Sequence, residues 1–226
     1  MTLHELEALR DQIRCFRDRT QAGHVLGEML IDRRGSGACV LAIPAGGLPV
    51  AEPLSRMLDL PLDVAVVSKI TPPWNSEVGC GAVAFDGTVR LNERLLSGLE
   101  LGEDEVRAGI EEASEKVERR VRALRGTEPP LAVAGRDVLL VDDGLASGFT
   151  MLTAAAALRI AGARSVLVAV PTGSTRALEL EGLGDVVDTI YCANVRGGRS
   201  FAVADAYEQW SDVDESQALE ILRRAR

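Results

Sequence analysis

Short apolar runs alternate with longer amphipathic stretches along most of this chain. The runs are rich in β-branched residues and lack the polar alternation of a half-exposed strand, which predicts strands buried on both faces. The stretches carry apolar residues at the 3.6-residue spacing of a helix. The predicted strands are residues 38–43, 62–69, 138–141, 165–170 and 186–191. The predicted helices are residues 3–30, a stretch that follows Pro49 and runs through about Met57, and residues 103–125, 149–159 and 215–224.

Strands that alternate with helices predict one class of fold. A parallel connection needs a crossover, usually a helix, and such crossovers are right-handed. We therefore expect an α/β protein with a parallel sheet of about five strands, flanked by helices. Residues 82–85 and 88–91, joined through Asp86 and Gly87, predict a β-hairpin in addition to this sheet.

Length and composition narrow the class of protein. The 226 residues suit a single domain, 1–226, with an N-terminal helical segment at 1–30 and a C-terminal tail at 192–226. Apolar residues make up 46% of the chain and charged residues 26%, which is typical of a globular protein. No apolar run approaches the roughly 20 residues of a membrane helix, and the N-terminus is too polar for a signal peptide. We therefore expect no membrane association and a cytoplasmic location.

Charge and cysteine content argue against two kinds of partner. The net charge of −9 argues against nucleic acid, whose binding relies on a basic surface. A small anionic ligand is compatible with this charge, because local N–H groups and a bound cation govern such a site. The four cysteines form no CxxC pair and there are only two histidines, so no zinc site is expected. Cys39 lies in an apolar run and is expected to be a core thiol.

The chain's most informative stretch follows the predicted strand 138–141. Two carboxylates, Asp142 and Asp143, stand at the end of this strand, and a turn of small residues leads from them into a helix. Free N–H groups and the positive end of the helix dipole make such a turn an anion site. The hydroxyls of Ser147 and Thr150 can add donors to a phosphate. Carboxylates need a different partner, such as sugar hydroxyls or a metal, so the stretch predicts a site for a phosphorylated sugar. The alternative is an ordinary strand, turn and helix with a capping aspartate.

Residues 138–150, Val-Leu-Leu-Val-Asp-Asp-Gly-Leu-Ala-Ser-Gly-Phe-Thr, resemble the phosphoribosyl diphosphate (PRPP) signature of type I phosphoribosyltransferases at all thirteen positions. The resemblance implies the fold of that family, with a flexible loop beside the hairpin and a small hood built from terminal segments. It implies that Asp142 and Asp143 hold the ribose 2′- and 3′-hydroxyls. The residues implied to wrap the 5′-phosphate are Gly144, Leu145, Ala146, Ser147, Gly148, Phe149 and Thr150.

A second loop, Ala45-Gly46-Gly47, follows the predicted strand 38–43 at the place of the family's pyrophosphate loop. Paired glycines let backbone N–H groups approach a ligand closely. The family often has an arginine where this chain has Ala45, and the change removes a bidentate phosphate contact, which puts turnover in doubt. Lys69, at the end of strand 62–69, matches a family lysine that reaches the pyrophosphate; the alternative is an ordinary strand-end lysine.

Four further stretches carry residues for which we keep two interpretations. Residues 70–81 match the family's flexible loop, in which Glu77 is either functional or an ordinary exposed carboxylate. Residues 16–23 resemble the opening of a family branch whose acceptor is poorly defined, but a surface helix with a solvated face (Arg17, Asp18 and Arg19) is favoured. The arginines of 119–122 are either a solvated helix end or a phosphate-binding patch, and the solvated helix end is favoured. In the tail, Tyr207 and Trp210 either pack or stack on a base, and packing is favoured.

The resemblance implies a Mg²⁺-dependent transfer of ribose 5-phosphate from PRPP to a nitrogen acceptor, a nucleobase, with release of pyrophosphate. Asp142, Asp143 and Lys69 are the expected catalytic residues. PRPP would hold Mg²⁺, with Asp142 or Asp143 contacting the ion through water, and no side-chain metal site is expected. A homodimer and a role in nucleotide salvage are implied as well. The alternatives are a non-catalytic PRPP- or nucleotide-binding regulator, and a phosphatase or phosphotransfer receiver that uses the strand-end aspartates. The acceptor base is not identified by any residue pattern.

Overall fold

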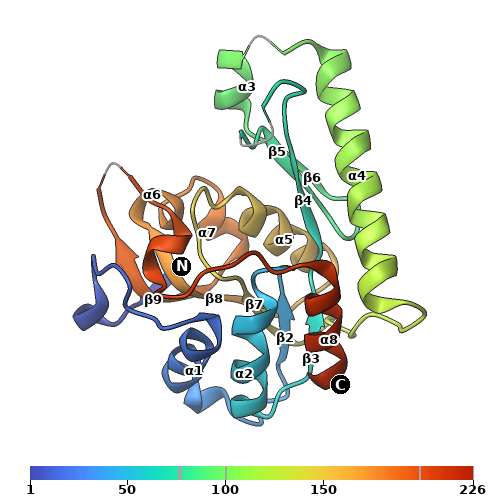
Figure 1. Ribbon diagram of the computed structural model, residues 1–226. Coiled ribbons are helices and arrows are strands. Elements are labelled where there is room, and N and C mark those ends of the chain that lie inside the picture. The colour runs from blue at the N-terminus through green and yellow to red at the C-terminus, as the bar shows by residue number, and fades with distance from the viewer. Residues whose placement is uncertain (76–77, 100, 199, 226) are drawn as a thin grey trace.

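A six-stranded sheet with strand order β1–β9–β8–β7–β2–β3 forms the centre of the molecule, and every neighbouring pair in it is parallel. The computed structural model describes residues 1–75, 78–99, 101–198 and 200–225 (Figure 1). The predicted parallel sheet is confirmed, with one strand more than the five expected. Its strands are β1 (Thr2–His4), β2 (Cys39–Ala42), β3 (Leu62–Val64), β7 (Asp137–Val141), β8 (Ser165–Ser174) and β9 (Thr189–Arg196).

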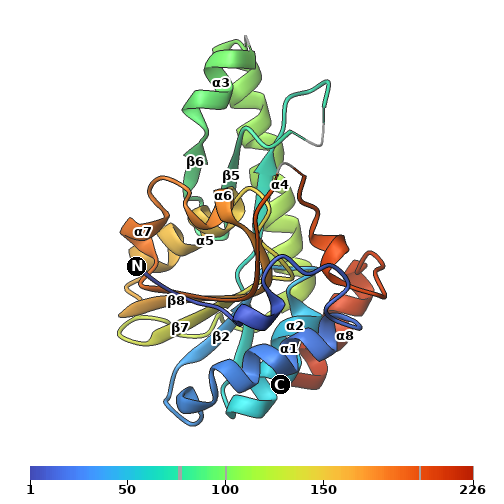
Figure 2. The same ribbon diagram turned by 90° about the vertical axis from the view of Figure 1, so that its left-hand side faces the viewer.

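Helices cover both faces of this sheet (Figure 1 and Figure 2). One layer consists of α1 (Arg19–Met29), α2 (Leu48–Leu58) and α8 (Glu215–Ala225); the other consists of α5 (Phe149–Ile160), α6 (Thr175–Leu178) and α7 (Leu183–Val186). Neighbouring residues of one strand enter different cores, since Leu139 belongs to the first and Leu140 to the second. This double burial explains why the strands are apolar throughout. Cys39 is fully buried, as predicted.

A smaller antiparallel sheet, β4–β5–β6, projects from one side of the main sheet together with α3 and α4 (Figure 1). The predicted hairpin is confirmed as β5 (Gly81–Ala84) and β6 (Val89–Leu91), and the predicted long helix as α4 (Glu103–Arg125). The remaining elements are β4 (Val67–Ile70), α3 (Glu93–Leu99) and the short 3-10 turns η1 (Glu7–Leu9), η2 (Ile31–Arg33) and η3 (Val203–Ala206). None of the described helices is both long and apolar enough to cross a membrane.

The predicted strand 62–69 is wrong in one respect, because it is two strands in two sheets. β3 ends at Val64 in the main sheet, and β4 begins at Val67 in the small one. Ala65 and Val66 between them are fully buried. No glycine, proline or polar residue marks the switch, so the apolar pattern runs through it unbroken. The strand predicted at 186–191 is β9, shifted toward the C-terminus, because Val186 ends α7.

The predicted helix 3–30 is correct only from Arg19 onward. Residues 2–4 form strand β1, and the chain continues irregularly alongside β9, where the Leu6 N–H donates to the Ala193 carbonyl at 3.2 Å. The Asp18 carboxylate accepts from the Gln21 N–H at 2.8 Å and caps α1. Apolar residues near the N-terminus are spaced as in a helix, but the edge of the sheet offers their backbone other hydrogen bonds.

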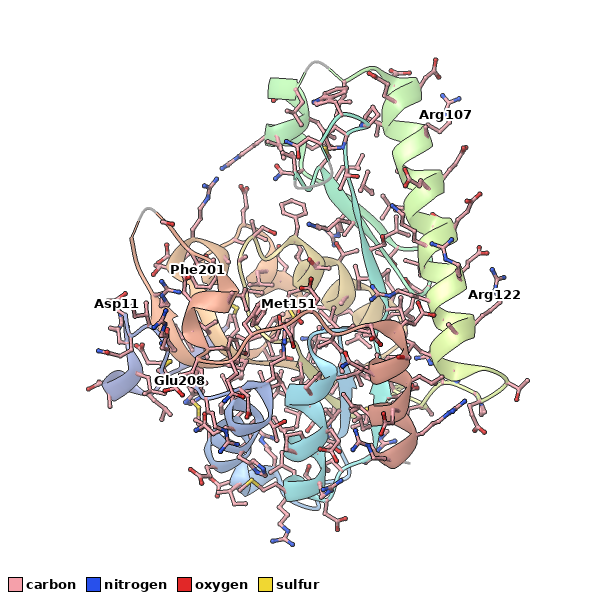
Figure 3. All side chains as sticks on the ribbon, viewed as in Figure 1. Asp11, Arg107, Arg122, Met151, Phe201 and Glu208 are labelled. Atoms are coloured by element: carbon pink, nitrogen blue, oxygen red, sulfur yellow. The ribbon has the colours of Figure 1, made fainter. Side chains whose placement is uncertain are left out.

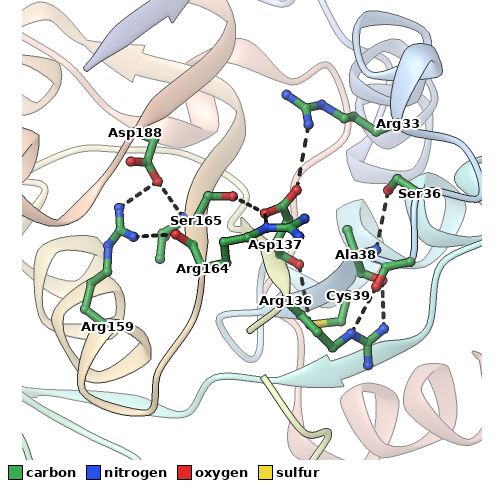
Figure 4. A network of polar contacts seen from close by, with 12 residues as sticks. Arg33, Ser36, Ala38, Cys39, Arg136, Asp137, Arg159, Arg164, Ser165 and Asp188 are labelled. Carbon is green, nitrogen blue, oxygen red and sulfur yellow. Dashed lines mark hydrogen bonds and ion pairs between the residues drawn. The ribbon is translucent and has the colours of Figure 1, made fainter. Parts of the chain in front are cut away.

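A cluster of ion pairs at the amino end of β7 ties the main sheet to its connections (Figure 4). The Asp137 carboxylate accepts from Arg164 Nε at 2.8 Å and from the Ser165 hydroxyl at 2.6 Å, and lies 3.9 Å from Arg33 Nη1. The hydrogen bond from Arg164 is the main reason why the pKa of Asp137 falls to about 2. This cluster lies at the opposite end of β7 from Asp142 and Asp143, so we assign it a structural role.

Candidate functional site

The loop that follows β7 is held in place by the end of β8. The Leu145 N–H donates to the Thr172 carbonyl at 2.9 Å, and the Ser174 N–H donates to the Leu145 carbonyl at 3.0 Å. Gly148 is the N-cap of α5 and has a φ of +81°, a conformation that suits glycine, and no side chain caps this helix. The loop is thus fixed on the sheet while the N-terminus of α5 keeps its backbone N–H groups free of side-chain caps.

Glycines bring the second predicted loop against the first. A Cβ on Gly46 would lie 2.1 Å from Asp143 Oδ2, and a Cβ on Gly47 would lie 2.7 Å from the Val141 carbonyl oxygen. Any side chain at these positions would collide with the carboxylate or with the end of β7. The Pro44–Ala45 peptide bond is cis. The structure therefore places the predicted diphosphate loop and the predicted ribose carboxylates in direct contact.

Arg19 lies in the site, which overturns its interpretation as part of a solvated face. Its Nε donates to Asp143 Oδ2 at 2.9 Å, and its Nη1 donates to the Ser211 carbonyl at 2.8 Å. The guanidinium also stacks on Trp210, with its central carbon 3.7 Å from the ring centroid. Only 9% of the Arg19 side chain is exposed. Arg17 keeps the predicted exposed position.

Tyr207 and Trp210 of the tail lie beside Asp143 and its partner Arg19, respectively. The Tyr207 hydroxyl donates to the Asp143 carbonyl at 2.6 Å, and its ring packs on Phe16. Burial raises the pKa of Tyr207 well above its ordinary value, so the hydroxyl remains a donor. The packing interpretation holds for Tyr207, which is 3% exposed, whereas Trp210 is 38% exposed and contacts Arg19.

The two aspartates of the loop both have raised pKa values. Burial raises the pKa of Asp142 well above its ordinary value, and the neighbouring Asp143 carboxylate raises it further. Burial raises the pKa of Asp143 as well, and the Arg19 guanidinium opposes that rise. Asp142 Oδ1 accepts from the Asp143 N–H at 2.9 Å. A pair of this kind favours a ligand that donates hydrogen bonds or carries positive charge.

Residues from both loops and from β4 line one cavity of about 400 Å³. Gly46, Lys69, Asp142, Asp143 and Thr150 are the predicted site residues that it brings together. Its other lining residues are Ile43, Pro44, Val67, Ser68, Thr71, Lys116 and Arg120. A hollow of about 790 Å³ lies elsewhere, around Leu60 and Pro130, and contains none of the predicted site residues.

Some predicted residues lie outside this cavity. Ala45 packs against the core, and Ala146 and Ser147 are exposed on the loop. Glu77 lies outside the described residues. Lys116 was not predicted as a site residue, and Arg120 only within the less favoured phosphate patch. Helical spacing shows which residues share a face but not what that face meets. The described residues contain no cluster of three or more histidines, cysteines or carboxylates able to hold a metal.

Fold and site together define an α/β protein whose polar loops meet at the carboxyl end of a parallel sheet, where open α/β sheets bind ligands. A model of the phosphoribosyl transferase domain matches residues 26–189. The chain therefore belongs to the phosphoribosyltransferase family, of type I, as the signature at 138–150 implied. The matched region contains both loops, Lys69 and α4, whereas Arg19, Tyr207 and Trp210 lie beyond its ends.

Two kinds of relative extend this finding. Curated proteins from the CDC 1551 and H37Rv strains of Mycobacterium tuberculosis, each named "Putative phosphoribosyl transferase", are 30% identical over 213 residues. That match covers 94% of this chain but 47% of the relatives, so the chain spans about half of their length. The crystal structure of the protein TT1426 from Thermus thermophilus is 32% identical, has a TM-score of 0.74, and matches over 94% of this chain and 99% of that one.

Proposed function

We propose that this protein transfers ribose 5-phosphate from PRPP to a nitrogen acceptor, a nucleobase, and releases pyrophosphate. The contact between Gly46 and the Asp143 carboxylate carries the proposal, because it sets a diphosphate loop directly beside ribose-binding carboxylates. Membership of the phosphoribosyltransferase family supports a PRPP-using transferase in general. The loop on the N-terminus of α5 supports binding of the 5′-phosphate.

The parts of PRPP correspond to the parts of the site. In this proposal the loop from Gly144 to Thr150 holds the 5′-phosphate, and Asp142 and Asp143 accept hydrogen bonds from the ribose 2′- and 3′-hydroxyls. The backbone of Gly46 and Gly47 approaches the diphosphate, and Lys69 provides a cation beside it.

The proposed chemistry is a displacement at the anomeric carbon of the ribose. Its bond to the diphosphate oxygen breaks, and the electron pair leaves on pyrophosphate. The lone pair of the acceptor nitrogen forms the new bond, and that nitrogen then loses its proton. Positive charge grows on the ribose ring as the leaving group departs, and the carboxylates of Asp142 and Asp143 offset it. Lys69 neutralises the charge on pyrophosphate, and positioning contributes the rest of the rate.

The donor set fits Mg²⁺ as an ion that is carried largely by the substrate. Mg²⁺ prefers oxygen ligands and keeps several waters when it binds through one or two carboxylates and phosphates. Asp142 and Asp143 provide such oxygens at the cavity, and burial raises the pKa of both carboxyls. When bound, Mg²⁺ would neutralise diphosphate charge.

One observation favours a second function, a PRPP- or nucleotide-binding regulator without turnover. Ala45 stands where the family often has an arginine, and its side chain packs against the core and not on the cavity. A protein that lacks this guanidinium can still bind a diphosphate through backbone N–H groups. Binding without chemistry would then be its activity.

Incubation with Mg²⁺, PRPP and a panel of purine and pyrimidine bases separates these functions. We expect one or more bases to cause release of pyrophosphate, measured by a coupled phosphate assay after pyrophosphatase treatment. Binding of PRPP with no release for any base would support the regulator. A protein that does not bind PRPP at all would contradict both functions.

A further inference from the structure

We propose that Lys116 and Arg120 of α4 bind the diphosphate of PRPP and supply the positive charge that is missing at Ala45. The inference rests on the proposed function and extends its diphosphate site to an element far from both loops in sequence. Both side chains line the same cavity as Lys69, Asp142 and Asp143.

Helix α4 is held in place at two points along β3 and β4. Near its C-terminus, Arg125 donates from Nη2 to the Val64 carbonyl at 2.7 Å and from Nε to the buried Asp63 carboxylate at 3.3 Å. Near its N-terminus, Gly109 packs so closely on β4 that a Cβ there would lie 3.1 Å from Ile70 Cγ2. Lys116 and Arg120 lie between these two contacts, and their backbone is therefore fixed beside the cavity.

The position of each side chain on α4 separates the cavity face from the solvent face. Ala113, Val117 and Leu124 form the buried stripe of the helix. Lys116 and Arg120 are four residues apart, next to this stripe, and are half-buried. Arg119 is exposed, and Arg122 points away from the molecule on the outer face (Figure 3). The interpretation of 119–122 as a solvated helix end thus holds for Arg119 and Arg122 but not for Arg120.

The charges around the cavity favour a multiply charged anion. Two carboxylates line it, and Asp143 is already paired with Arg19. Three cations, Lys69, Lys116 and Arg120, line it as well. Lys116 contacts Glu112 at 2.6 Å, while Arg120 has no hydrogen bond or ion pair with any side chain that the structure describes. A guanidinium beside a cavity can bind two phosphate oxygens at once, which is the contact that an alanine at position 45 cannot make.

Neighbouring arginines provide a matched pair of variants to test this proposal. Arg120→Gln removes the charge that lines the cavity, and Arg119→Gln removes the same charge one residue away on the exposed face. Each variant is titrated with PRPP, with pyrophosphate and with ribose 5-phosphate in the presence of Mg²⁺, and its thermal midpoint is recorded. Lys116→Gln serves as a second variant on the cavity side.

We expect Arg120→Gln to weaken binding of PRPP and pyrophosphate by roughly tenfold or more, since a charge-assisted phosphate contact is lost. Binding of ribose 5-phosphate, which lacks the diphosphate, should remain that of the wild type, and Arg119→Gln should change none of the three. Equal affinities in Arg120→Gln and Arg119→Gln, with PRPP bound normally by the wild type, would overturn this inference alone. Failure of the wild type to bind PRPP would instead overturn the proposed function, and this inference with it.

Discussion

Asp143 is contacted by residues from widely separated parts of the chain. Arg19 pairs with its carboxylate, Tyr207 donates to its carbonyl, and Gly46 packs against its side-chain oxygens. Arg19 is itself held by Ser211 and by stacking on Trp210. Each of these contacts limits the positions that the carboxylate can adopt, so the N-terminal segment and the tail both serve the orientation of one side chain.

Replacement of Arg19 tests how far this carboxylate depends on its partner. Arg19→Met leaves a half-buried carboxylate without its cation, and we expect the free energy of unfolding to fall by about 2 kcal/mol at pH 7. Arg17→Met is the control, because Arg17 is exposed and its pair with Asp18 should contribute little to stability. Urea unfolding followed by circular dichroism measures both. Equal losses in the two variants would show that the Arg19–Asp143 pair stabilises the fold no more than the exposed Arg17–Asp18 pair does.

Strand β7 carries different chemistry at its two ends. Its carboxyl end leads into the candidate site, while its amino end carries Asp137, whose pKa is lowered to about 2 chiefly by the hydrogen bond from Arg164 (Figure 4). A carboxylate with a lowered pKa stabilises the folded state above its unfolded pKa. That contribution is lost as the pH falls through the folded pKa. The stabilising contribution of Asp137 is therefore complete above about pH 5 and disappears between about pH 4 and pH 2.

The corresponding variant gives a stability difference that depends on pH. Asp137→Asn should lower the free energy of unfolding by about 2 kcal/mol at pH 7, and the difference from the wild type should shrink as the pH falls from 4 to 2. Exposed Asp32 provides the control variant, Asp32→Asn, which should have little effect at either pH. Denaturant unfolding at a series of pH values measures the difference. A loss that is equal at pH 7 and near pH 2 would contradict the electrostatic explanation.

Elements with strong local patterns were predicted well, and those that depend on distant partners were not. The bounds of α4 follow from its acidic start and basic end, and those of α5 from the glycine before Phe149. By contrast, β1 exists because β9 offers its edge to residues 2–4, and no residue near the N-terminus carries that information. The break between β3 and β4 falls within an unbroken apolar run, where the chain leaves one sheet for another.

At the scale of the whole molecule, the site residues also divide into those with a local sequence pattern and those that depend on distant partners. Asp142, Asp143 and Gly46 could be located from the sequence, because they follow apolar strands, and parallel strands end at one edge of the sheet. Lys69 was also located, although it lies within β4 of the antiparallel sheet and not at the end of a parallel strand. Arg19, Lys116 and Arg120 could not be located in this way, since each sits on a helix whose packing decides what it faces. Arg19 comes from a segment that resembles the opening of a family branch, which was the only signal for it.

The proposed function requires that both loops bind a single ligand. Gly46 packs against Asp143, so in the proposed function a PRPP held by the loop at 144–150 extends its diphosphate past Gly46 toward Lys69 and α4. PRPP has phosphate groups at both ends of one ribose and can therefore contact both loops at once. Ribose 5-phosphate and pyrophosphate should each occupy half of the site and compete with PRPP.

Calorimetric titration of PRPP into the protein with Mg²⁺, for the wild type and Asp143→Asn, tests this arrangement most directly. We expect the wild type to bind one PRPP per chain, and Asp143→Asn to bind it at least about tenfold more weakly and to turn over correspondingly less, because a charged acceptor for the ribose hydroxyls is lost. Asp212→Asn, at an exposed position in the tail, should bind as the wild type does. Unchanged affinity and turnover in Asp143→Asn would show that PRPP does not bind at these carboxylates.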